Sequence, residues 1–393
     1  LIKNIYLIIP IILMIFLYPL ALCVPFAIAL PIEHCIKNFY IQKAKKKLRT
    51  FSGKKIGITG SFGKTSTKNY LYQMLKEEFD VCATPKSFNT PMGVCKTILE
   101  DLKETDDYFI VEMGARHSGD IKFLADFVGV DFGIITPIGS CHLESFGTIE
   151  KIEDTKYELC ECTKNLVVFN GKSRSSKKLY DKYEHKKYLV CVEKSFAYAK
   201  NIHSTEEGST FTFVLDKSKF VCKTKLFGTS NIDNLVVAGA MAYLLGESLF
   251  SIQRAIEKIE PTPHRLELIK GEFVSVIDDS YNSNLEGFLE ALKTISTFKG
   301  RKVVVSPGMV ELGKEQYNQN YLAGKEVGKV SDIFLIMNET NKKSLRQGAL
   351  DGGLAEDKIF YASTRKEQQQ LLKQIIQKGD VVLFENDFPD NIK

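Results

Sequence analysis

Residues 54–66 of the chain, KKIGITGSFGKTS, decide how the rest of the sequence is interpreted. Lys55–Thr59 is a short apolar run typical of a buried strand, and two glycines follow it before a helical pattern begins. In such a strand–loop–helix unit the glycines let backbone N–H groups converge on phosphate oxygens, and the helix N-terminus adds a favourable dipole. Lys64 would neutralise the phosphates and Thr65 would hold Mg²⁺. The segment therefore predicts a nucleotide-binding P loop, in a variant form because Ile58 stands where the general pattern has glycine.

Further short apolar runs recur along the chain and alternate with helical patterns. Near-continuous Val/Ile runs of this kind indicate parallel sheets with helices on both faces. We expect an α/β fold with a P-loop central domain, whose sheet is mostly parallel, and a Rossmann-like C-terminal α/β domain. The best candidate hinge is Pro261-Thr262-Pro263, which separates residues 51–263 from 264–393. The predicted strands are Lys55–Thr59, Tyr108–Glu112, Phe132–Thr136, Leu166–Phe169, Val274–Asp278, Lys302–Ser306, Ile333–Met337, Ile359–Ala362 and Val381–Phe384.

The composition is that of a globular chain of two or three domains. Of 393 residues, 44% are hydrophobic and 26% are charged. Nine scattered cysteines without a Cys-x-x-Cys pair argue against a disulfide framework and a zinc ribbon, and six histidines argue against a multi-histidine metal cluster. The net charge is +5, but the first 50 residues alone carry +6, so the remainder carries −1 and gives no signal for nucleic-acid binding.

A long uncharged segment precedes the P loop. Asn4–Ile32 holds 29 residues without a charge, and about 20 apolar residues span a bilayer. Lys37 and the basic run 43–49 follow it, and positive flanks stay in the cytoplasm. We therefore expect one transmembrane helix and a basic juxtamembrane linker within residues 1–50. The chain would be a single-pass protein of the cell membrane, with residues 51–393 on the cytoplasmic side beside the anionic membrane surface. A buried helix of a soluble protein is the alternative.

Glu112 is the second candidate residue for nucleotide chemistry. It ends the apolar run Tyr108–Glu112, and a carboxylate at the carboxyl end of a parallel strand lies over the nucleotide crevice. Such a side chain suits a further Mg²⁺ ligand or the orientation of a water molecule. A carboxylate that only caps the surface is the alternative interpretation.

Several other motifs follow the P loop in order. They are Ser87–Gly93, Glu112–Arg116, Gly119–Ile121, His142–Glu144, Phe146-Gly147, Lys156 with Glu158, Gly228 with Asn231 and Asn234, Arg265–Glu267, Asp278–Asn284 and Gly308–Gly313. This ordered set, spread over about residues 51–320, resembles the Mur ligase family, the ATP-dependent amide ligases of peptidoglycan synthesis. It is most similar to the branch that adds D-alanyl-D-alanine.

The resemblance implies a reaction, its cofactors ATP and Mg²⁺, and roles for individual residues. A carboxylate of the acceptor attacks the γ-phosphate of ATP to give an acyl phosphate, and an amine then displaces phosphate to form an amide. The implied catalytic residues are Lys64, His142, Lys156 and Arg265. The implied metal-binding residues are Thr65, Glu112, His142 and Lys156, the last if it is carbamylated. The implied nucleotide-binding residues are Thr59, Gly60, Ser61, Gly63, Lys64, Thr65, Ser66, Asn231, Asn234, Arg265, Asp279, Tyr281 and Asn282.

The sequence departs from the family pattern at several points. Ser230 stands where the family usually has histidine, Leu285 replaces a proline, and Pro307 stands near a usual aspartate. Residues 384–387, Phe-Glu-Asn-Asp, replace a Lys-Gly-Ser segment. We expect that segment to be a solvated turn, and a site for the incoming ammonium group is the alternative.

The largest departure is at the front of the chain. The membrane segment and basic linker stand where the ordinary ligases carry the domain that grips the UDP part of their substrate. We therefore expect a carboxylate-bearing wall precursor, lipid-linked rather than UDP-linked, as the acceptor. The amine would be an amino acid or a dipeptide. Two alternatives remain: a ligase of a poly-amino-acid polymer such as polyglutamate, and a nucleotide-binding membrane scaffold.

Overall fold

The computed structural model describes residue 18 and residues 29–139, 143–281 and 284–387. Most of the predicted transmembrane segment Asn4–Ile32 thus lies outside the described residues. Within those ranges, none of the helices combines the length and the apolar content that a bilayer crossing requires. Residues 29–50 are helical and lead directly into the first domain.

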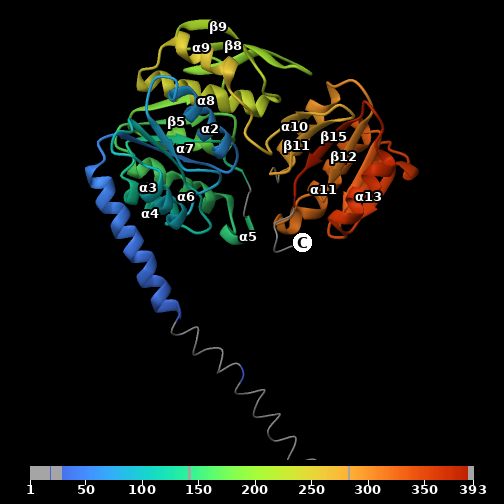
Figure 1. The fold of residues 1–393 in the computed structure, drawn as a ribbon, viewed down its shortest axis with the longest axis horizontal. Helices are drawn as coiled ribbons and strands as arrows, with labels where there is room; N and C mark the ends of the chain where they lie inside the picture. Colours follow the sequence, from blue (N-terminus) through green and yellow to red (C-terminus); the bar gives the residue numbers. More distant parts are fainter. Residues whose placement is uncertain (1–17, 19–28, 140–142, 282–283, 388–393) are drawn as a thin grey trace, which may run out of the picture.

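The helix over residues 29–50 is attached to the first domain only by its C-terminal end. Ala44, Leu48 and the following Phe51 are buried in the core on one face of the first sheet, and Nζ of Lys47 donates to the carbonyl oxygen of Leu99 at 3.3 Å. The earlier turns project away from the domain, as Figure 1 shows in blue. Large apolar side chains on these turns are exposed, namely Leu30, Ile32, Ile36, Phe39 and Tyr40.

The first domain is built on a nine-stranded sheet in the order β2-β3-β1-β4-β5-β6-β7-β8-β9. Its first six strands pair in parallel, and the apolar runs predict four of them, β1, β3, β4 and β5, whose two faces are both covered. The three-residue edge strand β2 and the half-buried β6 were not predicted. The last three form an antiparallel meander, which the pattern of apolar runs does not predict. The strands are β1 (Lys54–Thr59), β2 (Val81–Ala83), β3 (Tyr108–Glu112), β4 (Phe132–Ile135), β5 (Leu166–Asn170), β6 (Lys187–Val190), β7 (Ala197–Thr205), β8 (Gly208–Leu215) and β9 (Ser218–Thr224).

Helices cover both faces of this sheet. One face packs against α2 (Lys64–Leu75), α8 (Thr229–Leu245) and α9 (Leu249–Lys258). The other packs against α3, α4, α6 and α7. Of the 17 residues of α8, 12 are buried, since the helix lies between α2 and the antiparallel strands. The bounds of the remaining helices are α3 (Pro91–Glu100), α4 (Asp120–Val128), α5 (Leu143–Phe146), α6 (Ile149–Cys162) and α7 (Arg174–Lys182).

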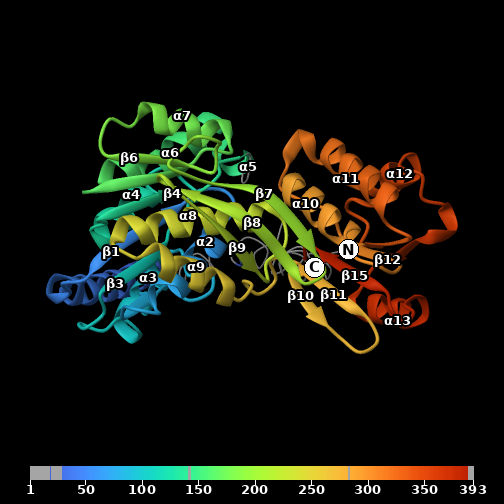
Figure 2. The same ribbon diagram turned by 90° about the horizontal axis from the view of Figure 1, so that it is seen from above.

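The second domain has a six-stranded sheet in the order β10-β11-β15-β12-β13-β14. All its pairings are parallel except that of the edge strand β10 with β11. Figures 1 and 2 show this domain, orange to red, beside the first, with α10 and β11 at the junction. Its elements are β10 (Glu267–Lys270), β11 (Ser275–Asp279), α10 (Leu285–Ser296), β12 (Lys302–Ser306), η1 (Gly313–Glu315), α11 (Gln316–Val330), β13 (Ile333–Met337), α12 (Lys342–Asp351), η2 (Glu356–Lys358), β14 (Ile359–Ala362), α13 (Arg365–Ile375) and β15 (Val381–Glu385).

Candidate active site

A cavity of about 1060 Å³ lies at the carboxyl ends of the parallel strands, between the two domains. The P loop, the segments after β3 and β4, and the start of α8 line it from the first domain. The segment before β10, the end of β11 and the start of α10 line it from the second. Such a crevice outside the carboxyl ends of the strands is where open α/β sheets bind ligands.

The P loop takes its shape from two glycines with positive φ. Gly60 has φ 146° and Gly63 has φ 75°, both in the region that side chains rarely adopt. A Cβ atom at Gly63 would also collide with Oδ1 of Asn234 on α8. The amide nitrogens of Ser61 and Phe62 donate to the carbonyl oxygen of Pro137, which fixes the loop on the segment after β4. These contacts aim the N-terminus of α2 into the cavity.

The polar side chains of the predicted loop divide into two groups. Nζ of Lys64 lies over the loop, 2.9 Å from the carbonyl oxygen of Gly60, where its charge can meet a phosphate. Ser66 lines the cavity at the start of α2. The hydroxyl groups of Thr59 and Ser61 instead bond to main-chain carbonyl groups. Oγ1 of Thr59 donates to the carbonyl oxygen of Met113, and Oγ of Ser61 donates to that of Gly139.

Glu112 is the centre of a buried polar cluster. Its Oε2 accepts from Oγ1 of Thr65 at 2.9 Å, and its Oε1 accepts from Nδ2 of Asn89 at 3.1 Å. Its backbone nitrogen donates to Oγ1 of Thr84. The hydroxyl of Thr65 and the carboxylate of Glu112 are hard oxygen donors of the kind that Mg²⁺ prefers, and they lie beside the phosphate-binding loop. The residues present therefore fit the implied metal ion.

Lys68 belongs to the same cluster and was not predicted. Its side chain is 1% exposed, with Nζ 3.4 Å from Oε2 of Glu112 and bonded to the carbonyl oxygen of Lys86. Burial lowers the pKa of Lys68, and the negative charge of Glu112 opposes that shift. The available signal was its spacing: Lys68 lies four residues after Lys64, on the same face of α2.

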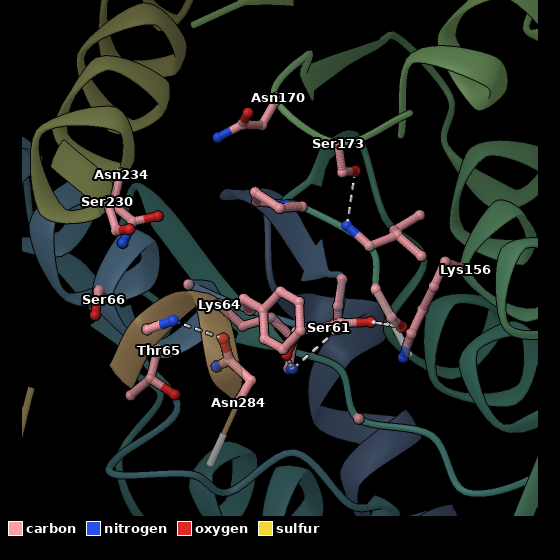
Figure 3. Close-up of a pocket in the computed structure, with 18 of the residues that line it drawn as sticks. Ser61, Lys64, Thr65, Ser66, Lys156, Asn170, Ser173, Ser230, Asn234 and Asn284 are labelled. Carbon is pink, nitrogen blue, oxygen red and sulfur yellow. Dashed lines mark hydrogen bonds between the residues drawn. The ribbon is translucent and has the colours of Figure 1, made fainter. Parts of the chain in front are cut away.

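The remaining predicted metal ligands are Lys156 and His142. Lys156 lies on α6, where it is buried and lines the cavity. Figure 3 shows its side chain pointing toward the P loop from the side opposite α8. His142 lies outside the described residues, and so does the predicted nucleotide ligand Asn282.

The two predicted asparagines of α8 lie at the cavity, and both polar atoms of the Asn231 amide and the amide oxygen of Asn234 are bonded within the protein. Oδ1 of Asn231 accepts from the hydroxyl of Tyr70 at 2.9 Å, and its Nδ2 donates to the carbonyl of Phe227. Oδ1 of Asn234 accepts from Oγ1 of Thr67 at 3.3 Å. The bonds to Tyr70 and Thr67 thus tie α8 to α2.

The second domain contributes Arg265, Asp279 and Tyr281 to the cavity wall. Oδ1 of Asp279 accepts from the backbone nitrogen of Leu266, which fixes the crossing segment on β11. Glu385, at the end of β15, is the register partner of Asp279 and is 1% exposed. Burial, with the adjacent charge of Asp279, raises the pKa of Glu385 well above its usual value. The expected solvated turn is therefore wrong for Glu385 and Asn386, because both are buried.

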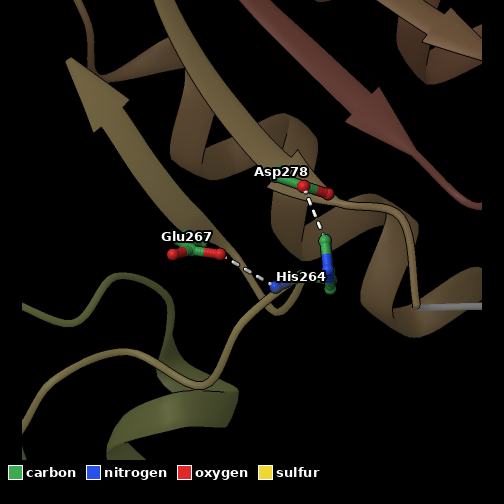
Figure 4. A group of neighbouring side chains, drawn as sticks. All are labelled: His264, Glu267 and Asp278. Carbon is green, nitrogen blue, oxygen red and sulfur yellow. Dashed lines mark hydrogen bonds and ion pairs between the residues drawn. The ribbon is translucent and has the colours of Figure 1, made fainter.

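A hydrogen-bonded group holds the crossing segment beside this wall. Nδ1 of His264 lies 2.8 Å from Oδ2 of Asp278, and the backbone nitrogen of His264 donates to Oε2 of Glu267 at 3.0 Å (Figure 4). The imidazole also packs on Tyr281, with ring centroids 4.5 Å apart. His264 and Leu266 both have positive φ, 63° and 49°, so these bonds maintain an unusual backbone conformation.

Comparison with known proteins gives two matching family models and a consistent set of relatives. The model of the Mur ligase middle domain matches residues 58–242, and that of the Mur ligase glutamate ligase domain matches residues 264–385. The UDP-N-acetylmuramoyl-tripeptide–D-alanyl-D-alanine ligase of Bacillus subtilis is 27% identical over 353 residues, which are 87% of this chain and 75% of that protein.

Solved structures are similar over the same region. The MurF ligase of Thermotoga maritima in complex with ADP has a TM-score of 0.80 and 27% identity, covering 89% of this chain and 80% of that one. The folylpolyglutamate synthase of Mycobacterium tuberculosis, complexed with ADP and AMPPCP, has a TM-score of 0.65 and 14% identity, covering 91% and 95%. At that identity the second likeness concerns the fold alone.

Proposed function

This chain belongs to the Mur ligase family of ATP-dependent acid–amino-acid ligases, and we propose that it joins D-alanyl-D-alanine or a similar amine to a carboxylate-bearing cell-wall precursor. One observation carries the proposal. The P loop, Glu112 and Lys156 of the first domain line or adjoin the same cavity as Arg265 and Asp279 of the second. An ATPase without an amine acceptor would leave that second wall without a role.

The residues of the first domain position the nucleotide. The P-loop backbone and the N-terminus of α2 bind the phosphates, and Lys64 balances their charge. Thr65 and Glu112 would hold Mg²⁺, which supplies charge neutralisation of the transferred phosphoryl group. Lys68 and Asn89 keep the Glu112 carboxylate in place.

The two domains together protect the reaction. The acceptor carboxylate attacks the γ-phosphorus of ATP, the bond to the β–γ bridging oxygen breaks, and ADP leaves. The amine then attacks the acyl phosphate, inorganic phosphate leaves, and the ammonium proton is lost. Because water competes with the amine, the wall formed by Arg265, Asp279 and Tyr281 must close over the intermediate.

We propose further that the helix over residues 29–50 holds these domains against a membrane of anionic lipid, on its cytoplasmic side. Its exposed turns carry Leu30, Ile36 and Phe39, and basic residues follow at 43–49. Apolar contact together with lysine attraction of about 1 kcal/mol per residue near the surface favours such binding. A lipid-linked wall precursor would then reach the cavity from the inner leaflet.

The test is release of phosphate from ATP by the full chain in detergent, with UDP-linked and lipid-linked muramyl peptides as acceptors and a panel of amines. We expect release only when Mg²⁺, an acceptor and D-alanyl-D-alanine or one other amine are all present. Glu112→Gln, with the exposed Glu207→Gln as its matched control, should abolish this coupled release. Phosphate release with the UDP-linked peptide but not with the lipid-linked peptide would overturn the proposal of a lipid-linked acceptor. Phosphate release that needs no acceptor would overturn the proposal of a ligase.

Membrane attachment is tested separately by flotation of the full chain with vesicles. We expect the protein to float with vesicles containing anionic lipid and to resist extraction at high salt. Protein that remains at the bottom of the gradient with every lipid composition would overturn this part of the proposal.

A further inference from the structure

Two acidic side chains meet at the end of the second sheet, behind the cavity wall. Asp279 ends β11 and Glu385 ends β15, and the two are register partners in neighbouring parallel strands. Asp279 lines the cavity, whereas Glu385 is only 1% exposed. The reaction steps use Asp279 in the closing wall and give Glu385 no role.

The sequence departs from the family pattern at this pair. The pattern has Lys-Gly-Ser where this chain has Glu385, Asn386 and Asp387. Asn386 has φ 60°, in the left-handed region that glycine favours, so Asn386 takes the place of the glycine and Glu385 that of the lysine. The backbone nitrogen of Asn386 donates to the carbonyl oxygen of Asp279 at 3.3 Å, which holds the two strand ends together. A lysine would pair with Asp279 as a cation, whereas a glutamate must bring a proton.

The bonds of the two carboxyl groups indicate which of them carries that proton. Two carboxyl groups this close and this buried cannot both be ionised, so the pair retains one proton. The backbone nitrogen of Leu266 donates to Oδ1 of Asp279 at 3.0 Å, and such a bond favours the ionised form of Asp279. Oε2 of Glu385 has no hydrogen-bond partner among the described residues, a burial that a neutral carboxyl group tolerates better than a carboxylate. The proton therefore lies on Glu385, in agreement with its raised pKa.

The elements packed around β15 leave Glu385 with two charged neighbours. α10 packs on β15 through apolar side chains, and β12 ends beside it in Val305 and Ser306, which carry no charge. Among the described residues, the charge of Asp279 raises the pKa of Glu385 and that of Arg265 lowers it. Arg265 also lines the cavity, so its charge is shared between the pair and a ligand bound there.

We infer that Glu385 is a positioning residue of the ligase: its protonated carboxyl group donates a hydrogen bond to the Asp279 carboxylate and holds that side chain at the cavity wall. The inference rests on the proposed function, because the wall matters only if it closes over the acyl phosphate. When the proton is lost, the two carboxylates repel each other and draw Arg265 onto themselves, away from the phosphate. Ligation should therefore fall as the pH rises through the pKa of the pair.

The pH dependence of kcat for the full chain tests this inference. Phosphate release is measured from about pH 6 to about pH 10 with MgATP, D-alanyl-D-alanine and a UDP-linked or a lipid-linked muramyl peptide. In Glu385→Gln an amide N–H donates to Asp279 at every pH. Its kcat should match that of the wild type near neutral pH and exceed it by about tenfold or more at the alkaline end. The ratio of the two rates removes the ionisation of the substrates, which is common to both proteins, and a ratio that stays constant with pH would overturn the inference.

Two further variants separate positioning from folding. Glu385→Leu has no donor, so its kcat should fall by about tenfold or more at every pH, in protein that calorimetry shows to be folded. Glu247→Gln replaces another buried carboxyl group whose pKa is raised, and as the matched control it should keep the wild-type pH profile of kcat. An unchanged kcat in Glu385→Leu would also overturn the inference, whereas a wild type that releases no phosphate with either acceptor would overturn the proposed function itself.

Discussion

At the scale of single residues, the buried pair of Lys68 and Glu112 makes the sharpest prediction. Lys68→Met leaves the Glu112 carboxylate buried without its cation, and breaking such a pair costs about 3–5 kcal/mol. We expect a marked fall in the unfolding temperature, measured by calorimetry. Lys96→Met is the matched control, because the Lys96–Glu100 pair is exposed and contributes at most about 1 kcal/mol. Equal effects of the two substitutions would contradict the buried-pair account.

Glu247 lies outside the cavity, and its buried carboxyl group should make the stability of the folded protein depend on pH. It is buried, and neither of its carboxylate oxygens has a hydrogen-bond partner in the part of the chain that the structure describes. Burial, with the charges of Glu78 and Glu77, raises its pKa to about 7. The folded state therefore holds a proton that the unfolded state loses above about pH 4.5, so stability falls as the pH rises from there to about 7.

Glu247→Gln should remove that loss. The variant is expected to unfold at a higher temperature than the wild type at pH 8, by a free energy of up to about 3 kcal/mol, and to match it at pH 4. Thermal unfolding across this range is the measurement, with the exposed Glu207→Gln as control. A variant that is equally or less stable at pH 8 would show that Glu247 is not held protonated by burial.

At the scale of elements, the turn between β1 and α2 depends on space as well as on backbone angle. Gly63→Ala places a methyl group against Oδ1 of Asn234 and forces alanine to a φ of 75°. Gly119→Ala imposes a similar angle, 92°, at the start of α4, where a Cβ meets nothing within 4 Å. Both should lose about 1–2 kcal/mol of stability. Only Gly63→Ala should also weaken ATP binding, by tenfold or more. Calorimetric titration with ATP measures this difference. Equal affinity of the two variants for ATP would contradict the prediction.

How far the sequence predicts these elements depends on how local the signal is. The strands β3, β12, β13 and β14 have the predicted bounds, because each is a short run of mostly apolar residues; the first three are buried almost throughout, and the edge strand β14 in part. The antiparallel strands were missed because polar residues on their exposed faces interrupt the apolar runs, as Lys219 and Lys223 do in β9. The edge strand β10 was missed for the same reason, since its last two residues are exposed.

The residues of the candidate site also differ in how local their sequence signal is. The P loop is contained in 13 consecutive residues, 54–66, so its pattern is visible in the sequence. Lys68 pairs with Glu112, a residue 44 positions away, and Glu385 lies beside Asp279 of a strand much earlier in the chain. No single stretch of sequence contains both partners of these groups. Their roles follow from the pairing of distant elements, which the order of motifs alone does not provide.

At the scale of the whole molecule, direct contacts between the domains set how the cavity is enclosed. Oε1 of Glu290 on α10 accepts from Oγ1 of Thr229 at 2.9 Å and from its backbone nitrogen at the start of α8. Farther along the interface, Oε1 of Glu206 accepts from the backbone nitrogen of Lys299 at 2.6 Å. Both contacts are exposed, so each contributes little free energy and the two domains can separate for substrate entry.

The double variant Glu206→Ala/Glu290→Ala should therefore shift the domains toward a more open arrangement. We expect a larger radius of gyration by small-angle X-ray scattering and a lower kcat for ligation, because the wall around Asp279 closes less often over the acyl phosphate. The affinity for MgATP should fall less than kcat, since the P loop and Glu112 lie in the first domain, whereas Arg265, Asp279 and Tyr281 of the second complete the wall. Glu315→Ala, an exposed change within the second domain, is the control. A fall in MgATP affinity as large as the fall in kcat would mean that these contacts shape the nucleotide site itself, whereas an unchanged kcat would mean that they do not limit closure.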